Sequence, residues 1–312
     1  MQGRIKYEWL NWLGKRERKS LVAKFSIQKI KYPPIFIVGA PRTGSTILYQ
    51  LITNFFPVQY FSNYMIENFQ IIFETSKKQF EKYGFVKHNT FSSEFGETES
   101  PLGPAEGSYF WYQWFDFDKH FTMQNELSEA SRKEIYSVIA TLVNEHNRPI
   151  VFKNLNHSVR LQALHQIFPE ALIIHIKRQS LFTAQSLYKA RLKKSGDVQK
   201  WLSVKPKEYE SIKILTAEEQ IASQIYFIEK QIEQDKNLFN PTAYLEISFE
   251  ELCADTYSEM KRIEDFFKRN NLELKFEGSS TLRIDENPNR IYLESSIFDS
   301  IRSAVEKTFG QS

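Results

Sequence analysis

The stretch that decides the fold runs from Phe36 to Thr46 and reads FIVGAPRTGST. It begins inside a short apolar run, Ile35 to Val38, which follows two prolines and ends at Gly39. A run of β-branched residues between turn-forming residues predicts a buried parallel strand. Beyond the loop, apolar residues recur at helical spacing from Thr46 to Phe55. The stretch therefore predicts a strand, a loop of small residues and a helix.

The loop between strand and helix has the composition of an anion-binding site. Gly39 and Gly44 have the spacing of a phosphate-binding loop. Nucleoside triphosphatases continue with Lys and then Ser or Thr, whereas Ser45 takes the lysine position here. Backbone amides at a helix N-terminus attract anions, and Arg42 adds a cation that can bind two oxygens at once. We expect the anion to be held by Arg42, Thr43, Gly44, Ser45 and Thr46.

A magnesium nucleotide fits this loop poorly. The predicted strand from Ala171 to Ile176 leads into Lys177-Arg178, and we find no strand that ends in a magnesium-binding Asp. No His, Cys or Asp cluster has the spacing of a metal site. An anion that needs donors but no metal is therefore favoured. A P-loop kinase or nucleotide hydrolase is the rival interpretation.

Apolar patterns elsewhere in the chain alternate between strands and helices. Further strands are predicted at residues 149–152, 171–176 and 243–247, and helices at 126–146, 159–168, 181–191, 218–233, 257–267 and 296–308. Residues 84–108 are rich in Gly, Ser, Glu and Pro, which indicates an irregular functional loop. The alternation predicts a three-layer α/β/α domain over residues 32–312, with a central parallel sheet and helical elaborations.

A second motif connects the loop to a known family. The sequence APRTGST resembles the 5'-phosphosulfate loop of the sulfotransferases that use 3'-phosphoadenosine-5'-phosphosulfate. Those enzymes also carry a strand ending in Arg and a helical Ser eight residues later, which bind the donor's 3'-phosphate. Here Arg178 ends a strand and Ser186 follows eight residues on. The resemblance covers residues 36–191 and is looser over 192–312. It implies a P-loop-like sulfotransferase fold with this donor and no metal.

The resemblance also implies a lysine beside the leaving group. Lys153 ends the strand predicted at residues 149–152. The family often has a Lys there, close to the bridging oxygen of the phosphosulfate. Negative charge builds on the leaving phosphate as the sulfuryl group departs, and a cation stabilises that charge. We therefore expect Lys153 and Arg42 to act on the reacting group.

The catalytic base is where the sequence departs from the family. Cytosolic sulfotransferases place a His two residues after the strand lysine, and Leu155 stands there in this chain. Other members place a Glu after the loop helix, and Asn63 lies near that position. Three groups remain as candidate bases: Glu106, Glu67 and His157. We favour Glu106 because it lies in a Gly-rich loop that leads into aromatic residues.

The expected reaction is transfer of a sulfuryl group from the donor to a hydroxyl, with a carbohydrate as the expected acceptor. The aromatic block at residues 109–117 is suited to stack on a sugar or a lipid. A second rival is a non-catalytic module that binds anionic glycans through the basic N-terminal residues. We expect no nucleic-acid partner.

The N-terminal residues 1–31 form a basic arm with nine Lys or Arg and two Glu. An amphipathic helix on an anionic membrane surface would suit them. A helix packed on the body with its charges in water is the more usual arrangement. Cys253 is the single cysteine, which favours a reducing compartment, and no apolar run reaches the length of a membrane span. We therefore expect a cytoplasmic protein, with peripheral membrane contact through residues 1–31 as the alternative to packing of the arm on the body.

Overall fold

A computed structural model describes residues 12, 14–23, 29–84, 91, 93–94, 97–284 and 287–310. Its centre is a five-stranded sheet in the order β2-β5-β1-β6-β7, in which every pairing is parallel. The strands are β1 (Ile35–Val38), β2 (Gln59–Tyr60), β5 (Ile150–Lys153), β6 (Leu172–Lys177) and β7 (Tyr244–Ser248). Because β1 lies in the middle, the loop that follows it opens at the centre of the sheet's carboxyl edge, where ligands of such folds bind.

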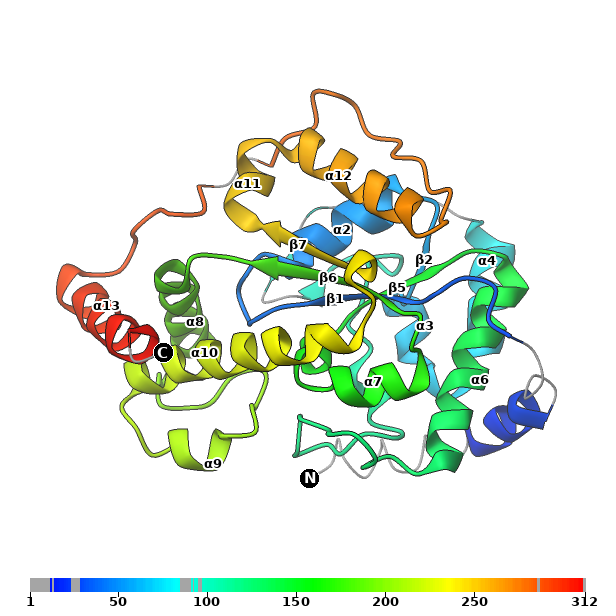
Figure 1. Ribbon diagram of the computed structural model, residues 1–312, viewed down its shortest axis with the longest axis horizontal. Coiled ribbons are helices and arrows are strands. Elements are labelled where there is room, and N and C mark those ends of the chain that lie inside the picture. The colour runs from blue at the N-terminus through cyan, green and yellow to red at the C-terminus, as the bar shows by residue number, and fades with distance from the viewer. Residues whose placement is uncertain are drawn as a thin grey trace.

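Helices cover both faces of the sheet, as Figure 1 shows. Successive side chains of β1 point to opposite faces of the sheet, so they contact different sets of helices. Phe36 and Val38 belong to a buried apolar cluster with the helices α6 (Glu129–His146), α7 (Leu161–Ile167), α8 (Ser180–Ser195) and α10 (Ala217–Asp235). Ile35 and Ile37 belong to a second cluster with α2 (Ser45–Phe55) and α12 (Thr256–Arg269). The predicted three-layer α/β/α architecture with a parallel sheet is confirmed.

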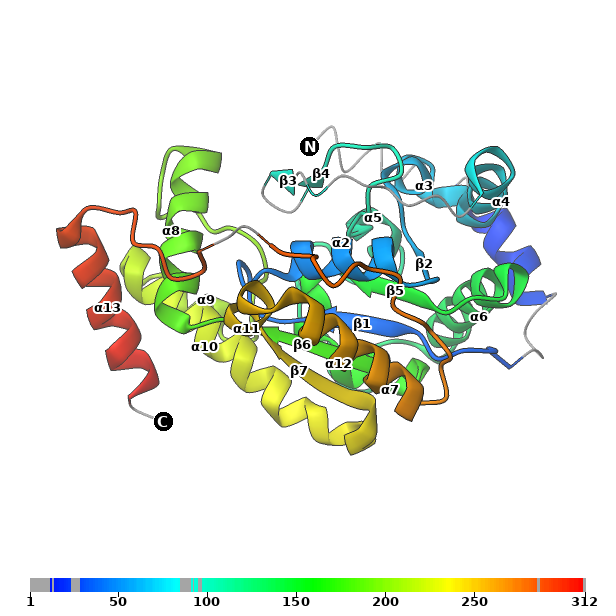
Figure 2. The ribbon, with the colours of Figure 1, turned by 90° about the horizontal axis from the view of Figure 1, so that it is seen from above.

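The helices of the core lie close to their predicted positions. In chain order they are α2 (Ser45–Phe55), α6 (Glu129–His146), α7 (Leu161–Ile167), α8 (Ser180–Ser195), α10 (Ala217–Asp235), α12 (Thr256–Arg269) and α13 (Ser295–Phe309). Ser and Thr caps begin several of them, since Ser128 and Thr216 each accept a hydrogen bond from a backbone amide three residues on. Helix α13 packs beside α8 and α10 at one end of the sheet, and α4 packs on α6 at the other (Figure 2).

Several short elements carry no clear pattern in the sequence. These are the helices α3 (Asn63–Glu67), α4 (Ile72–Tyr83), α5 (Ser108–Trp111), α9 (Tyr209–Ile212) and α11 (Phe249–Ala254), and the 3-10 turns η1 (Phe69–Ile71), η2 (Leu155–Val159), η3 (Lys236–Leu238) and η4 (Pro241–Ala243). The loop predicted at residues 84–108 contains a small antiparallel hairpin of β3 (Ser93–Glu94) and β4 (Glu97–Thr98). Strands of two residues are too short to leave a readable alternation.

The described part of the N-terminal arm is helical from residue 14 to 23 and packs on the body. Arg18 is buried, and its Nε donates to the Glu134 carboxylate on α6 at 2.9 Å. Leu21 is buried in the main apolar cluster. Much of the arm, and with it most of the predicted membrane contact, falls on residues 1–11, 13 and 24–28, which lie outside the described residues. Among the helices that are described, none is both long and apolar enough to cross a membrane.

Candidate active site

A cleft of about 1180 Å³ opens over the carboxyl edge of the sheet. Its floor is the loop between β1 and α2, and its walls come from segments far apart in the chain. Almost all of the residues singled out in the sequence line it: Arg42, Gly44, Ser45, Thr46, Glu106, Lys153, Arg178 and Ser186. Thr43 is buried, and its hydroxyl donates to the Ala40 carbonyl at 2.9 Å, so its side chain supports the loop from within.

The loop has a backbone that few sequences can adopt. Gly44 has a φ of 89°, and a Cβ atom at this position would lie 2.2 Å from the ring of Phe249. Glycine is therefore required by both conformation and space. Arg42 also has a positive φ, 72°, which is uncommon for a residue with a long side chain. Such conformations persist where the surrounding structure holds them, and they gather at binding sites.

The first turn of α2 presents its amides to the cleft. Gly44 precedes the helix, and no side chain caps the helix N-terminus. Gly44, Ser45 and Thr46 all line the cleft. Since uncapped amides at a helix N-terminus carry partial positive charge, this turn is suited to bind phosphate or sulfate oxygens.

The two arginines and the serine of the predicted anion site lie together. The Arg42 Nε donates to the Ser186 Oγ at 3.2 Å, and Arg178 donates to the Arg42 carbonyl at 3.3 Å. Arg178 also donates to the Pro288 carbonyl, and it lies over the Phe249 ring, with 5.2 Å from its Cζ to the ring centre. Burial lowers the pKa of Arg42, and the nearby Arg178 adds to this, whereas Tyr292 opposes it. Two guanidinium groups this close predict a binding site for more than one negative charge.

Lys153 and Glu106 meet at the centre of the cleft. Lys153 is buried at the end of β5, and its Nζ donates to the Thr46 Oγ1 at 3.0 Å. The same ammonium forms an ion pair with Glu106. Two groups predicted from the sequence to act on the reacting atoms are thus in direct contact, beside the first turn of α2.

The other candidate bases lie elsewhere. Glu67 is exposed at the end of α3 and does not line the cleft. His157 is fully buried, with its ring 4.4 Å from that of Trp111 in an edge-on contact. Burial lowers the pKa of His157 well below its usual value, and Arg160 adds to the effect. The geometry therefore favours Glu106 over Glu67 and His157, and its role as base stays a prediction.

Asn63 has a structural role that its sequence position does not reveal. Its side-chain amide donates to the carbonyls of Thr98 and Ser100, at 2.7 and 2.8 Å. It thereby fixes the loop that leads to Glu106. The Asn154 amide donates to the Glu106 carbonyl at 3.3 Å from the other side. The glutamate is thus held on a loop that two asparagines anchor to the core.

Several cleft residues could not be found from the sequence. Phe249 follows β7 at the carboxyl edge, and the segment from Asn287 to Tyr292 crosses α8 near the C-terminus. The Gln185 side chain anchors that segment, since it donates to the Arg290 carbonyl and accepts from the Tyr292 amide, both at 3.0 Å. Pro288 and Arg290 are 110 and 105 positions from the side chains that bond to them, those of Arg178 and Gln185, so no local pattern marks this segment.

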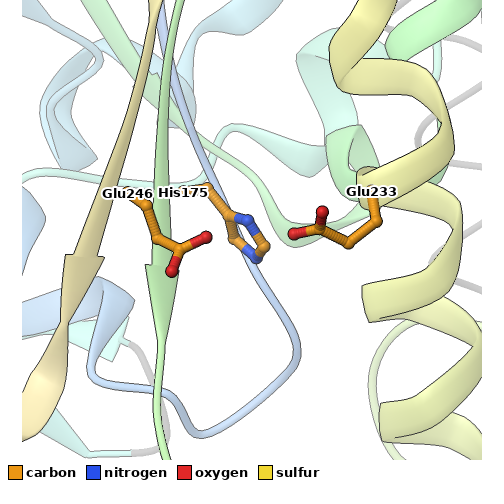
Figure 3. A group of neighbouring side chains, drawn as sticks. All are labelled: His175, Glu233 and Glu246. Carbon is orange, nitrogen blue, oxygen red and sulfur yellow. The ribbon is translucent and has the colours of Figure 1, made fainter.

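One group of side chains has the composition of a metal site. His175 on β6, Glu246 on β7 and Glu233 on α10 point towards one another, as Figure 3 shows. However, the Lys177 Nζ lies 2.8 Å from a carboxylate oxygen of Glu233 and 2.8 Å from one of Glu246. Lys177 pairs with both carboxylates and Lys236 pairs with Glu233 as well, so the group is better explained as an ion-pair network.

Comparisons with known proteins agree with this fold. Two solved structures have the same fold. The first is the sulfotransferase STF1 of Mycobacterium tuberculosis, with a TM-score of 0.53 and 13% sequence identity, and the match covers 97% of this chain and 82% of that one. The second is the sulfotransferase STF9 of Mycobacterium avium, with a TM-score of 0.52 and 15% sequence identity, and the match covers 91% of this chain and 76% of that one.

Among curated proteins, the omega-hydroxy-beta-dihydromenaquinone-9 sulfotransferase Stf3 of Mycobacterium bovis, and that of Mycobacterium tuberculosis, are each 21% identical to this chain over 257 residues. The match covers 74% of this chain and 61% of the relative, so the chain spans less than two thirds of the relatives' length. A family model described as the sulfotransferase family matches residues 33–272. That match covers most of the chain, and the protein belongs to the sulfotransferase family.

Proposed function

We propose that the protein transfers a sulfuryl group from 3'-phosphoadenosine-5'-phosphosulfate to the hydroxyl of an acceptor. The observation that carries the proposal is the position of Lys153, whose ammonium contacts both Thr46 at the start of α2 and Glu106 in the cleft. A cation beside an anion-binding helix N-terminus suits a leaving phosphate, and a carboxylate next to it suits an attacking hydroxyl.

In the proposed step, the acceptor oxygen forms a bond to sulfur while the bond from sulfur to the bridging oxygen breaks. The hydroxyl proton passes to the Glu106 carboxylate, and the electron pair of the broken bond stays on the phosphate. Lys153 and the amides of Ser45 and Thr46 stabilise the negative charge that develops there. The contact with Lys153 fixes the position of the Glu106 carboxylate beside the first turn of α2.

The nucleotide end of the donor would lie towards Arg178. Arg178 and Ser186 line the same side of the cleft, and both are linked to Arg42. Two guanidinium groups and a hydroxyl are suited to bind the 3'-phosphate and the sulfated phosphate of one ligand. No metal ligand is needed for this arrangement.

The donor assignment is tested by calorimetric titration of the product, 3'-phosphoadenosine-5'-phosphate, against the wild type and Arg178→Ala. We expect the substitution to raise the dissociation constant by about 10- to 100-fold, because hydrogen bonds to charged groups contribute about 1.5–3 kcal/mol. Lys189→Ala is the control, since this lysine is exposed on the same helix as Ser186 and does not line the cleft. Equal affinity in the wild type and Arg178→Ala would disprove the assignment. Magnesium-dependent turnover of ATP would favour the kinase or hydrolase alternative.

Part of the cleft lining is apolar. Ile66, Tyr109, Leu155, Leu187 and Leu202 belong to it. Such a wall favours an alcohol with a large apolar part, and the Stf3 relatives act on a menaquinone derivative. The carbohydrate acceptor expected from the sequence would depend on Tyr109 and its aromatic neighbours for stacking.

The two acceptor classes are separated by supplying a long-chain prenyl alcohol and a neutral oligosaccharide with radiolabelled donor. We expect label on the prenyl alcohol and little on the sugar. The reverse result would restore the carbohydrate proposal without affecting the donor assignment.

A further inference from the structure

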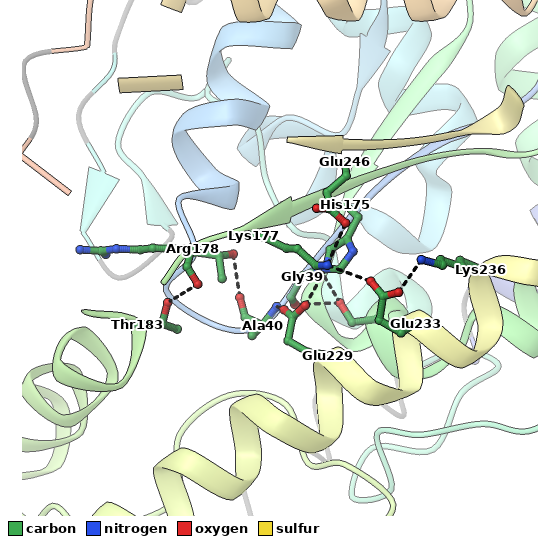
Figure 4. A network of polar contacts seen from close by, with 12 residues as sticks. Gly39, Ala40, His175, Lys177, Arg178, Thr183, Glu229, Glu233, Lys236 and Glu246 are labelled. Carbon is green, nitrogen blue, oxygen red and sulfur yellow. Dashed lines mark hydrogen bonds and ion pairs between the residues drawn. The ribbon is translucent and has the colours of Figure 1, made fainter. Parts of the chain in front are cut away.

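Two side chains form hydrogen bonds to the start of the anion-binding loop. The Ser158 hydroxyl accepts the Gly39 N–H at 3.0 Å and donates to the Gly39 carbonyl at 2.9 Å. The next amide, that of Ala40, donates to the Glu229 Oε1 on α10 at 3.0 Å (Figure 4). The first two amides of the loop are therefore used by the protein itself. The later ones, from Gly44 to Thr46, line the cleft.

The Glu229 carboxylate also lies next to a residue of the sheet. Its other oxygen, Oε2, lies 2.9 Å from the His175 Nε2, although the two atoms do not have hydrogen-bond geometry. The His175 ring is fully buried on β6, and its Nδ1 bonds to the Tyr244 hydroxyl on β7. The chain of contacts thus runs from β7 through β6 and α10 to the loop.

The position of the Glu229 carboxylate, next to a loop proposed to bind anions, requires an explanation. Its negative charge opposes a bound phosphate or sulfate, so it costs binding energy unless it does something else. A carboxylate is also a stronger acceptor for a backbone amide than a neutral group is. The Arg42 backbone two residues on has a positive φ, which the loop keeps only if its ends are fixed.

We propose that Glu229 is a positioning residue of the donor site. Its carboxylate fixes the Ala40 amide so that the loop keeps the conformation in which the amides of Gly44 to Thr46 face the donor. The His175 ring lies beside the carboxylate and is itself bonded to Tyr244. The inference rests on the proposed function for the identity of the anion. It adds a residue 189 positions from the loop in the sequence, one that never touches the donor.

The same helix supplies a matched control. Glu233 lies one turn further along α10 and belongs to the same polar network, where it pairs with Lys177 and Lys236. None of its hydrogen bonds within the described residues reaches the loop. Glu233→Ala therefore removes a carboxylate from the same helix face without removing a loop contact.

The first measurement is hydrogen exchange of the ligand-free protein, read on the peptide that contains residues 39–44. We expect Glu229→Ala to speed exchange there by about tenfold, since a protected amide loses its acceptor. Glu229→Gln keeps an acceptor oxygen and restores the protection. Glu233→Ala leaves the peptide unchanged.

The second measurement is the dissociation constant of 3'-phosphoadenosine-5'-phosphate for the same variants. We expect an increase of about tenfold for Glu229→Ala, and a value within about threefold of the wild type, or tighter, for Glu229→Gln. In turnover, Glu229→Ala raises the KM for the donor more than it lowers kcat.

Three outcomes would overturn the proposal. They are unchanged exchange in Glu229→Ala, failure of Glu229→Gln to rescue, and an equal effect of Glu233→Ala. If the wild type does not bind the nucleotide at all, the proposed function falls. The exchange comparison still decides whether Glu229 holds the loop, so the two failures can be told apart.

Discussion

The two ends of the cleft are built in different ways. At the donor end, hydrogen bonds tie the loop after β1 and the start of α2 to four other elements. Ser158 of η2, Ser186 of α8 and Glu229 of α10 accept them, and Lys153 of β5 donates one. At the acceptor end, Tyr109 is 44% exposed, and Glu106 lies on a loop anchored by Asn63. A site that must bind one fixed ligand is placed on rigid elements, whereas selectivity for a variable ligand is carried by surface loops.

The largest expected effect separates catalysis from donor binding. Glu106→Gln removes the proposed base at the acceptor end and leaves the loop contacts intact. We expect kcat to fall by about 10²- to 10⁴-fold, the range for loss of a general base. The dissociation constant of 3'-phosphoadenosine-5'-phosphate should change by less than about threefold, because no hydrogen bond to the loop is lost.

Glu67→Gln is the control for that prediction, since Glu67 was an alternative base and lies outside the cleft. Its kcat should stay close to that of the wild type. A Glu106→Gln variant with wild-type kcat would show that another group takes the proton. The assignment of the catalytic base to the acceptor end would then be wrong.

A smaller effect is expected at the rim of the acceptor end. Tyr109 lies against Phe69 and Phe117, with ring centres 6.2 and 6.5 Å away. Tyr109→Ala should raise the KM for the acceptor by about 2- to 10-fold, the effect of losing one aromatic contact. Initial rates at varied acceptor concentration measure it, with the donor KM as the internal reference.

Phe80→Ala is the matched control, because Phe80 is also an exposed aromatic residue, at 42%, but lies on α4 away from the cleft. If both variants change the acceptor KM equally, the rim does not select the acceptor. A change in the donor KM alone would place Tyr109 at the other end of the cleft.

The smallest effect concerns the N-terminal helix, which lies outside both ends. Burial raises the pKa of Glu17 to about 7, although the hydrogen bond from the Glu74 amide opposes the shift. Between about pH 4.5 and pH 7, Glu17 is therefore protonated in the folded state and ionised in the unfolded state. Docking of this helix is thus expected to weaken as the pH rises through that window.

Glu17→Gln should remove this dependence and stabilise the protein at pH 8 by on the order of 1 kcal/mol, because the carboxylate is only partly buried. Thermal melting at pH 5 and pH 8 measures the difference, and nucleotide binding should be unchanged. An equal gain at both pH values would mean that the charge of Glu17 is not its cause.

Local sequence patterns predict those elements whose ends and apolar spacing are set by residues close together in the chain. The strand from Ile35 to Val38 and the helix from Ser45 were both predicted within a residue, because proline, glycine and apolar spacing mark their ends. Helix α4 and the hairpin in residues 93–98 were not predicted. The two strands of the hairpin hold two residues each, which is too few for a readable alternation.

By itself, the sequence determined the class of the fold and the anion-binding loop. Both follow from residues that are neighbours in the chain: a buried strand, the two glycines and the start of a helix. Only the tertiary structure decided that Glu106 faces Lys153, that Glu229 supports the loop, and that the segment from Asn287 to Tyr292 closes the cleft. Those partners are 47 to 189 positions apart where they form direct bonds. Such pairings depend on how the whole chain packs around the sheet, which no local spacing encodes.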